Sequence, residues 1–166
     1  HSGFAHGKTD SLATCLRVLS GPGMAAKVFT MLAEAGVSVD MIVQASASTG
    51  TADISFTVPG SAAAKVQEVL QEKQDELGYQ SFDIDANVGK VAVVGVGMKT
   101  HSGLAAKFFN ALSDKGVNVL MISTSEIRIA ALVPLEQLQD AVRALHTAYG
   151  LDADQVEAVV YGGTGR

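Results

Sequence analysis

The chain repeats itself after 80 positions, and this internal repeat limits the possible folds more than any other feature. The segments 22–44 and 102–124 read PGMAAKVFTMLAEAGVSVDMIVQ and SGLAAKFFNALSDKGVNVLMIST. They are identical at 11 of 23 aligned positions. Similar composition alone does not produce this agreement, so we interpret the chain as two copies of one supersecondary unit.

Within each copy the hydrophobic pattern predicts the order strand, helix, strand, strand, helix, strand. Apolar runs and period-two alternation indicate the strands, while apolar residues at helical spacing followed by glycine indicate the helices. The expected strands are 12–18, 37–41, 54–58 and 81–85 in the first copy, and 90–96, 117–121, 127–133 and 156–161 in the second. The second helix of each copy is expected at 62–77 and 135–149.

This order predicts an α+β protein of two tandem ferredoxin-like βαββαβ units, each an antiparallel sheet with helices on one face. We expect an N-terminal tail or remnant at 1–11, the first unit at 12–87 and the second at 88–166. Ile42, Leu120 and Ile122 are expected on the face opposite the row that begins at Val37. Apolar residues there suggest association between sheets, of the two copies or of two chains. The alternative is that they only complete small cores.

Composition narrows the classes of function. Hydrophobic residues make up 48% and charged residues 17%, which favours a folded protein over a disordered one. The net charge of −5 and the lack of tryptophan argue against nucleic-acid binding. Cys15 is the only cysteine, and no apolar run approaches the roughly 20 residues that cross a bilayer. We therefore expect a cytoplasmic protein without a membrane partner.

The residues offer no catalytic or metal-binding constellation. The four histidines lack helical metal spacing, and no nucleophile motif occurs. The loop-to-helix junction from Ser20 to Ala25 is more informative, because the free N–H groups of a helix start attract a carboxylate. We expect Ser38 and Asp40, or Asn118 in the second copy, to lie near such a junction and to meet the ammonium of an α-amino acid. The alternative is a tight turn that needs glycine for geometry alone.

Several motifs resemble the C-terminal regulatory region of aspartokinases. They are VAVVGVGMKTHSG at 91–103 and ISTSEIRI at 122–129, together with VDMIVQ at 39–44 and TADISFTV at 51–58. The ending EAVVYGGTGR, at 157–166, is similar to that of actinobacterial aspartokinases and their free-standing small subunits. The resemblance extends over nearly the whole chain.

The resemblance implies two ACT units that form a homodimer with those of another chain. It implies that lysine, threonine or both bind at ACT–ACT interfaces and exert feedback control on an aspartokinase catalytic domain or subunit. No lysine-glycine-glycine kinase opening occurs, so ATP and Mg²⁺ would belong to a kinase domain outside this chain. The implied effector contacts are Ser20, Pro22, Gly23, Met24, Ala25, Ser38, Val39, Asp40 and Gln44 in the first unit, and Leu104, Ala105, Asn118, Val119, Thr124 and Ser125 in the second.

The chain departs from the family pattern at the first of these sites. Relatives usually carry an aspartate in a D-K-P-G loop, where this chain has Ser20. Relatives also read Q-N-V where this chain has Gln44-Ala45-Ser46. Losing a charge-assisted partner weakens binding by about 1.5–3 kcal/mol, or roughly ten- to a hundredfold. We therefore expect a weakened or retuned first site.

Three other functions compete with this interpretation, and the residues argue against the last two. A stand-alone amino-acid sensor without a kinase partner fits the same motifs. A nucleic-acid-binding ferredoxin-like domain would need exposed aromatic residues and a basic face. A small enzyme would need an acid, base or nucleophile cluster, which the sequence does not show.

Overall fold

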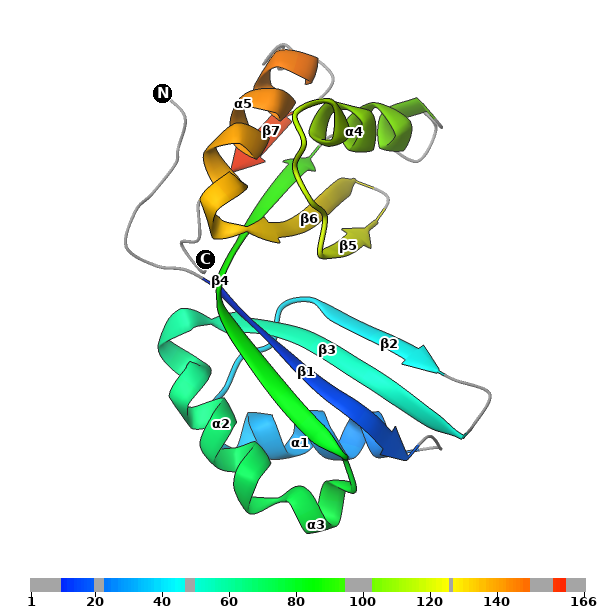
Figure 1. Cartoon of the computed structure of the whole chain (residues 1–166), viewed down its shortest axis with the longest axis vertical. Helices are drawn as coiled ribbons and strands as arrows, with labels where there is room; N and C mark the ends of the chain where they lie inside the picture. Colours follow the sequence, from blue (N-terminus) through cyan, green and yellow to red (C-terminus); the bar gives the residue numbers. More distant parts are fainter. Residues whose placement is uncertain are drawn as a thin grey trace. The chain divides into compact units, whose positions relative to one another are not determined.

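The computed structural model describes residues 10–19, 23–46, 50–94, 103–125, 127–149 and 157–160. The chain divides into two compact units, which we call the first unit (Asp10–Ala86) and the second unit (from Asn87 onward). In each of them, helices cover one face of a β-sheet (Figure 1). No helix in the described ranges is long and apolar enough to cross a membrane.

The first unit follows the predicted order of elements. Its sheet order is β2-β3-β1-β4, and β3 is antiparallel to both of its neighbours. This is the strand order of a ferredoxin-like unit. The elements are β1 (Asp10–Leu19), α1 (Met24–Glu34), β2 (Ile42–Ser46), β3 (Thr51–Pro59), the 3₁₀ turn η1 (Gly60–Ala62), α2 (Ala63–Glu72), α3 (Gln74–Leu77) and the first part of β4 (Ser81–Val94).

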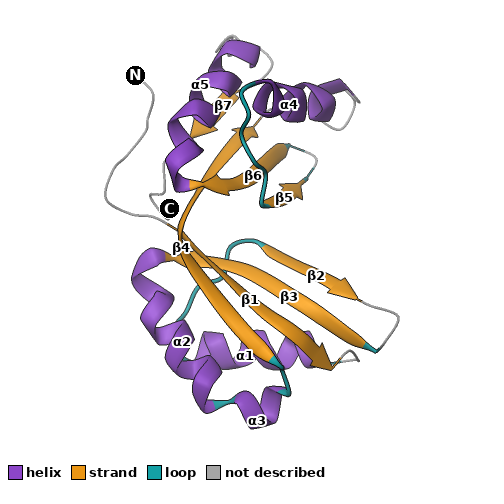
Figure 2. Cartoon of the chain, viewed as in Figure 1, coloured by secondary structure: helices purple, strands orange, loops and turns teal. Residues whose placement is uncertain are grey.

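The second unit repeats this arrangement. Its strand order is β5-β6-β4-β7, and all of these neighbours are antiparallel. Figure 2 shows its helices on one side of the sheet, as in the first unit. The elements are the second part of β4, α4 (Gly103–Asp114), β5 (Met121–Thr124), β6 (Arg128–Pro134), the 3₁₀ turn η3 (Leu135–Gln137), α5 (Leu138–Tyr149) and β7 (Glu157–Val160).

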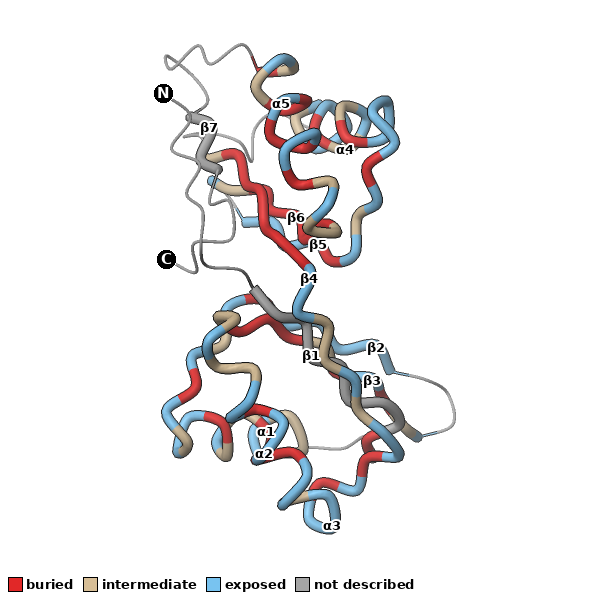
Figure 3. The backbone as a smooth tube through the Cα atoms, turned by 60° about the vertical axis from the view of Figure 1, so that its left-hand side comes forward, coloured by how far each residue is buried: buried red, intermediate tan, exposed pale blue. Residues whose placement is uncertain are grey.

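Each unit has its own apolar core between its sheet and its helices. In the first, Leu32 of α1 and Leu70 of α2 are buried with Phe56 of β3. In the second, Phe108 of α4 and Leu145 of α5 are fully buried. Buried positions recur at helical spacing along these helices and in runs along the central strands (Figure 3). The apolar periodicity of the sequence thus folds each helix against its own sheet.

Strand β4 differs from the expectation of two separate strands at 81–85 and 90–96. It runs without a break from Ser81 to Val94 and serves both sheets. Gly89 lies between the two expected strands, and its backbone is not in the left-handed region. A Cβ atom there would lie 2.8 Å from Cδ2 of Leu138. This glycine therefore makes room for a core side chain and does not form a turn.

Two other boundaries differ from the prediction. The helix expected at 62–77 is interrupted at Lys73, whose angles are φ −104° and ψ 16°, and it ends at Gly78 in the left-handed conformation. The strands expected at 37–41 and 117–121 begin only at Ile42 and Met121. Buried and exposed residues still alternate at 37–41 and 117–121. Side chains of an extended segment point to alternate sides even where the segment forms no regular β-ladder.

Candidate functional site

The start of helix α1 carries backbone donors without a side-chain cap. Gly23 precedes the helix with φ +89°, a left-handed conformation that glycine adopts without steric cost. The first turn contains no acidic residue. The first N–H groups of a helix have no intrahelical partner and form the positive end of its dipole. This helix start, with the half-buried Met24 and Ala25, can therefore receive a carboxylate.

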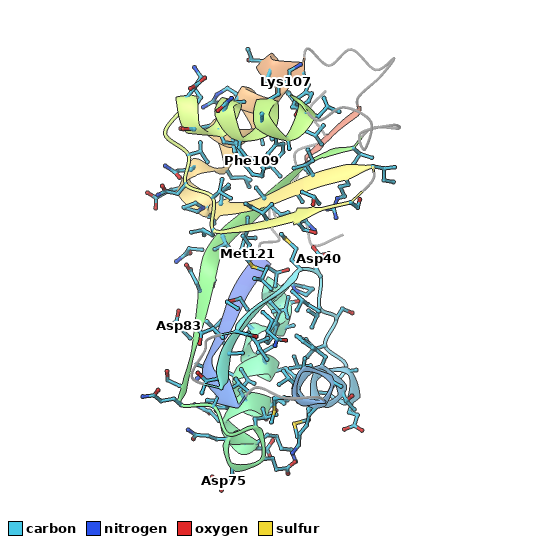
Figure 4. The ribbon with its side chains drawn as sticks, turned by 90° about the vertical axis from the view of Figure 1, so that its right-hand side faces the viewer. Asp40, Asp75, Asp83, Lys107, Phe109 and Met121 are labelled. Carbon is cyan, nitrogen blue, oxygen red and sulfur yellow. The ribbon has the colours of Figure 1, made fainter. Side chains whose placement is uncertain are left out.

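The start of helix α4 is held by the last helix of its unit. The hydroxyl of Tyr149 donates a hydrogen bond of 2.9 Å to the carbonyl oxygen of Leu104. The ammonium of Lys107 lies 4.7 Å from the centroid of the Tyr149 ring, a cation–π contact. Burial raises the pKa of Tyr149 to about 12, so its hydroxyl keeps the proton that it donates. Phe109 lies on the sheet side of α4, with Lys107 on the other side, and Ala105 is exposed (Figure 4).

A β-bulge precedes the edge strand in both units. In the first, the N–H of Asp40 donates to the carbonyl of Thr57 and the N–H of Thr57 donates to the carbonyl of Met41, each at 3.0 Å. Two residues thus oppose one, and the N–H of Met41 donates to Oγ1 of Thr57 at 3.0 Å. The repeat has the same irregularity, where the N–H of Leu120 donates to the carbonyl of Leu132 at 2.7 Å and the next residue pairs with Leu132.

The bulge changes the face of the sheet on which the side chains of the edge strands lie. Ile42 pairs with Phe56, and Ile122 pairs with a buried residue of β6, so both lie on the helix-covered face. The prediction that these two residues lie opposite the row of Val37 is therefore wrong. The extra residue reverses the alternation within the segment. Leu120 stands inside the bulge and keeps the expected face.

The register places Gln44 at the end of the sheet from which helix α1 begins. Gln44 pairs with Ile54, a core residue, so its side chain lies on the helix-covered face of edge strand β2. The end of β2 pairs with the start of β3, which also pairs with Leu19 at the end of β1. Helix α1 begins just after that point. Thr124 occupies the corresponding place in the second unit, paired with core residue Ile129.

The remaining predicted contacts lie at the other end of each helix. Ser38 follows the last residues of α1, whose 11 residues extend about 16 Å. The expectation that Ser38 and Asp40 lie beside the helix start is wrong within one unit. The physical reason is that the helix runs back along the sheet before the second strand begins. Asn118 stands in the same relation to α4, and Val39 and Val119 pack partly into the two cores.

The remaining predicted contact residues are Ser20, Pro22 and Ser125. Ser20 and Pro22 lie outside the described residues. Ser125 closes a tight turn, where its N–H donates to the carbonyl of Arg128 at 2.8 Å. Its hydroxyl accepts the N–H of Ile127 at 3.4 Å. Among the described residues, no group of three or more histidine, cysteine or acidic side chains could hold a metal ion.

Comparison with known proteins assigns this arrangement to a family. The ACT domain family model matches residues 17–74 and 91–149. The crystal structure described as aspartokinase alpha and beta subunits aligns with a TM-score of 0.80 at 39% identity, over 88% of this chain and 99% of that chain. The chain belongs to the ACT regulatory domains of aspartokinases.

Other relatives agree with this assignment. The regulatory subunit of aspartate kinase from Thermus thermophilus, in its ligand-free form, aligns with a TM-score of 0.80 at 35% identity. The alignment covers 85% of this chain and 93% of that subunit. An aspartokinase of Corynebacterium glutamicum is 44% identical over 99% of this chain. The chain spans 39% of the length of that relative, so it corresponds to only part of it.

Sequence reasoning missed three residues that shape these ACT units. Thr57 gave no signal, because a threonine in a strand is ordinary. Tyr149 was placed in the predicted helix, but its contact with Leu104 joins residues 45 positions apart. The carboxamide of Gln137 hydrogen-bonds the backbone of Gly116 and Asn118. The first unit has Ala62 in the corresponding turn, so a comparison of the two turns would have shown the difference.

Proposed function

We propose that the two ACT units bind lysine, threonine or both and thereby control an aspartokinase catalytic domain or subunit. One observation supports this most strongly. In both units the first helix begins at the same end of the sheet, and on the same face, as a polar residue of the edge strand. This residue is Gln44 in the first unit and Thr124 in the second. An α-amino acid needs donors for its carboxylate and acceptors for its ammonium, and the two elements offer both.

A single unit does not bring the predicted acidic residues to its own helix start. In their own unit, Ser38 and Asp40 follow the far end of α1, a helix about 16 Å long, which exceeds the reach of a small amino acid bound at its start. We propose that the corresponding residues of a second copy provide the acidic side of the site, within a homodimer. Asp40 is the strongest candidate acceptor for an ammonium group, because it carries a full charge and is exposed at the bulge.

The edge strands support association between copies. Ile42 is 52% exposed and Ile122 is 48% exposed, although both lie on the helix-covered face. Edge strands β2 and β5 each pair with a single neighbour within the described sheets, so their outer N–H and C=O groups can pair with another strand. Apolar side chains beside such an edge favour a protein partner over solvent.

Lysine as an effector also has support from a distant relative. A structure of Escherichia coli aspartokinase III was solved in complex with lysine and aspartate, and it shares this fold with a TM-score of 0.65 at 23% identity. We also propose that this chain binds no cofactor and that ATP and Mg²⁺ bind to a kinase domain. We further propose a cytoplasmic location.

A thermal-shift series tests the proposed function. Lysine and threonine, added separately, should raise the melting temperature with saturation, while leucine should not. Asp40→Asn should weaken the apparent affinity roughly ten- to a hundredfold, the worth of a charge-assisted contact. Asp75→Asn, at an exposed position of α3, is the matched control and should leave it unchanged. A folded chain that responds to neither amino acid would refute the proposal.

A further inference from the structure

The second unit contains a side-chain clamp between the 3₁₀ turn η3 and the segment before its edge strand. The Oε1 atom of Gln137 accepts the N–H of Asn118 at 2.9 Å. Its Nε2 atom donates to the carbonyl oxygen of Gly116, also at 2.9 Å. One carboxamide thus meets a donor and an acceptor two residues apart, and only this orientation of the amide satisfies both.

The clamp fixes the backbone that carries Asn118. Gly116 follows helix α4 in the left-handed conformation, with φ +69°, and Val117 between the two clamped groups is buried. The bulge at Leu120 follows directly. The backbone of Asn118 is therefore held on both sides, although its side chain is exposed. An exposed residue with a fixed backbone loses less conformational freedom when it binds a ligand.

The first unit lacks the means to form this clamp. Both 3₁₀ turns follow a proline that ends a strand, Pro59 in one unit and Pro134 in the other. The third residue of the turn is Gln137 in the second unit and Ala62 in the first. Alanine has no side-chain donor or acceptor. The two units thus differ at the residue that holds the segment of Asn118 or of Ser38.

We propose that Gln137 is a positioning residue for amino-acid binding in the second ACT unit, where it acts through Asn118. The inference rests on the proposed function and adds a difference between the units. The second unit presents a preorganised Asn118, while the matching Ser38 segment of the first unit is held without such a clamp. The two units then bind the same amino acid with unequal affinity.

Calorimetric titration of the full 166-residue chain with threonine, and separately with lysine, tests this inference. Gln137→Ala should weaken the binding attributed to the second unit about fivefold, which corresponds to about 1 kcal/mol at 1.4 kcal/mol per tenfold change. Gln137→Glu keeps the acceptor for Asn118 but loses the donor to Gly116, so it should also weaken binding. Gln139→Ala, at an exposed position near the start of the following helix α5, is the matched control and should bind as the wild type does.

A double variant separates positioning from a general structural role. If Gln137 acts through Asn118, Gln137→Ala combined with Asn118→Ala should bind no more weakly than Asn118→Ala alone. Additive losses would overturn the inference, as would unchanged binding by Gln137→Ala. Absence of binding to the wild-type chain would overturn the proposed function together with this inference, whereas wild-type binding that Gln137→Ala leaves unchanged would overturn this inference alone.

Discussion

The hydroxyl of Thr57 holds the bulge in the first unit, and its removal gives a quantitative test of that geometry. Thr57 is 1% exposed, and its Oγ1 accepts the N–H of Met41 at 3.0 Å. Thr57→Val keeps the shape and the β-branching while removing this acceptor. The variant loses a hydrogen bond worth about 0.5–1.5 kcal/mol, and a buried N–H left unpaired adds to a total of about 1–3 kcal/mol.

Urea and thermal unfolding followed by circular dichroism can measure this loss. In a domain of this size, 1 kcal/mol corresponds to a melting shift of about 4–8 °C, so the transition of the first unit should fall by at least about 4 °C. Thr57→Ser retains the hydroxyl and should lose less stability than Thr57→Val. Thr30→Val, at an exposed position of α1, should stay within about 0.5 kcal/mol of the wild type. Equal stability of Thr57→Val and Thr30→Val would refute the role of the hydroxyl.

Two further changes probe the second unit. Gly89→Ala places a Cβ 2.8 Å from Cδ2 of the buried Leu138 and should destabilise the unit by about 1–3 kcal/mol in urea unfolding. Gly103→Ala, whose Cβ meets nothing within 4 Å, should be neutral or slightly stabilising, and equal effects of the two would contradict this packing. Tyr149→Phe loses the hydrogen bond to Leu104 and should cost about 0.5–1.5 kcal/mol. Because burial raises the pKa of Tyr149 to about 12, the unfolded chain releases this proton first. The contribution of Tyr149 to stability is then complete below pH 10 and lost as the pH rises through 12. The variant should lack this part of the pH dependence, and identical alkaline slopes would contradict it.

The sequence was sufficient to predict the order of elements and the two tandem units. The repeat and the hydrophobic periods depend on local patterns, which the cores at Leu32 and Leu112 follow closely. Such patterns predict which residues are buried, as for Val37, which is buried although its segment is not part of a regular strand. They do not predict where the β-ladder of a strand begins, because that depends on the partner strand.

The faces and ends of the candidate site could not be predicted in the same way. A bulge inserts one residue into the alternation, and its signature is a set of hydrogen bonds with Thr57, 16 residues away from Met41. The error at Ile42 followed from this single residue. The opposite placement of Ser38 follows from the length of α1, because the chain leaves this 11-residue helix at the end opposite its start.

The most direct test of the central claim is an NMR titration of the chain with threonine and with lysine, following backbone amide shifts. The account predicts saturable changes centred on a helix start and its neighbouring edge strand, at Ala25 and Gln44 in the first unit or at Ala105 and Thr124 in the second. Saturable binding that leaves all four amides unmoved would contradict the assignment of the helix starts as the carboxylate-binding ends of the site.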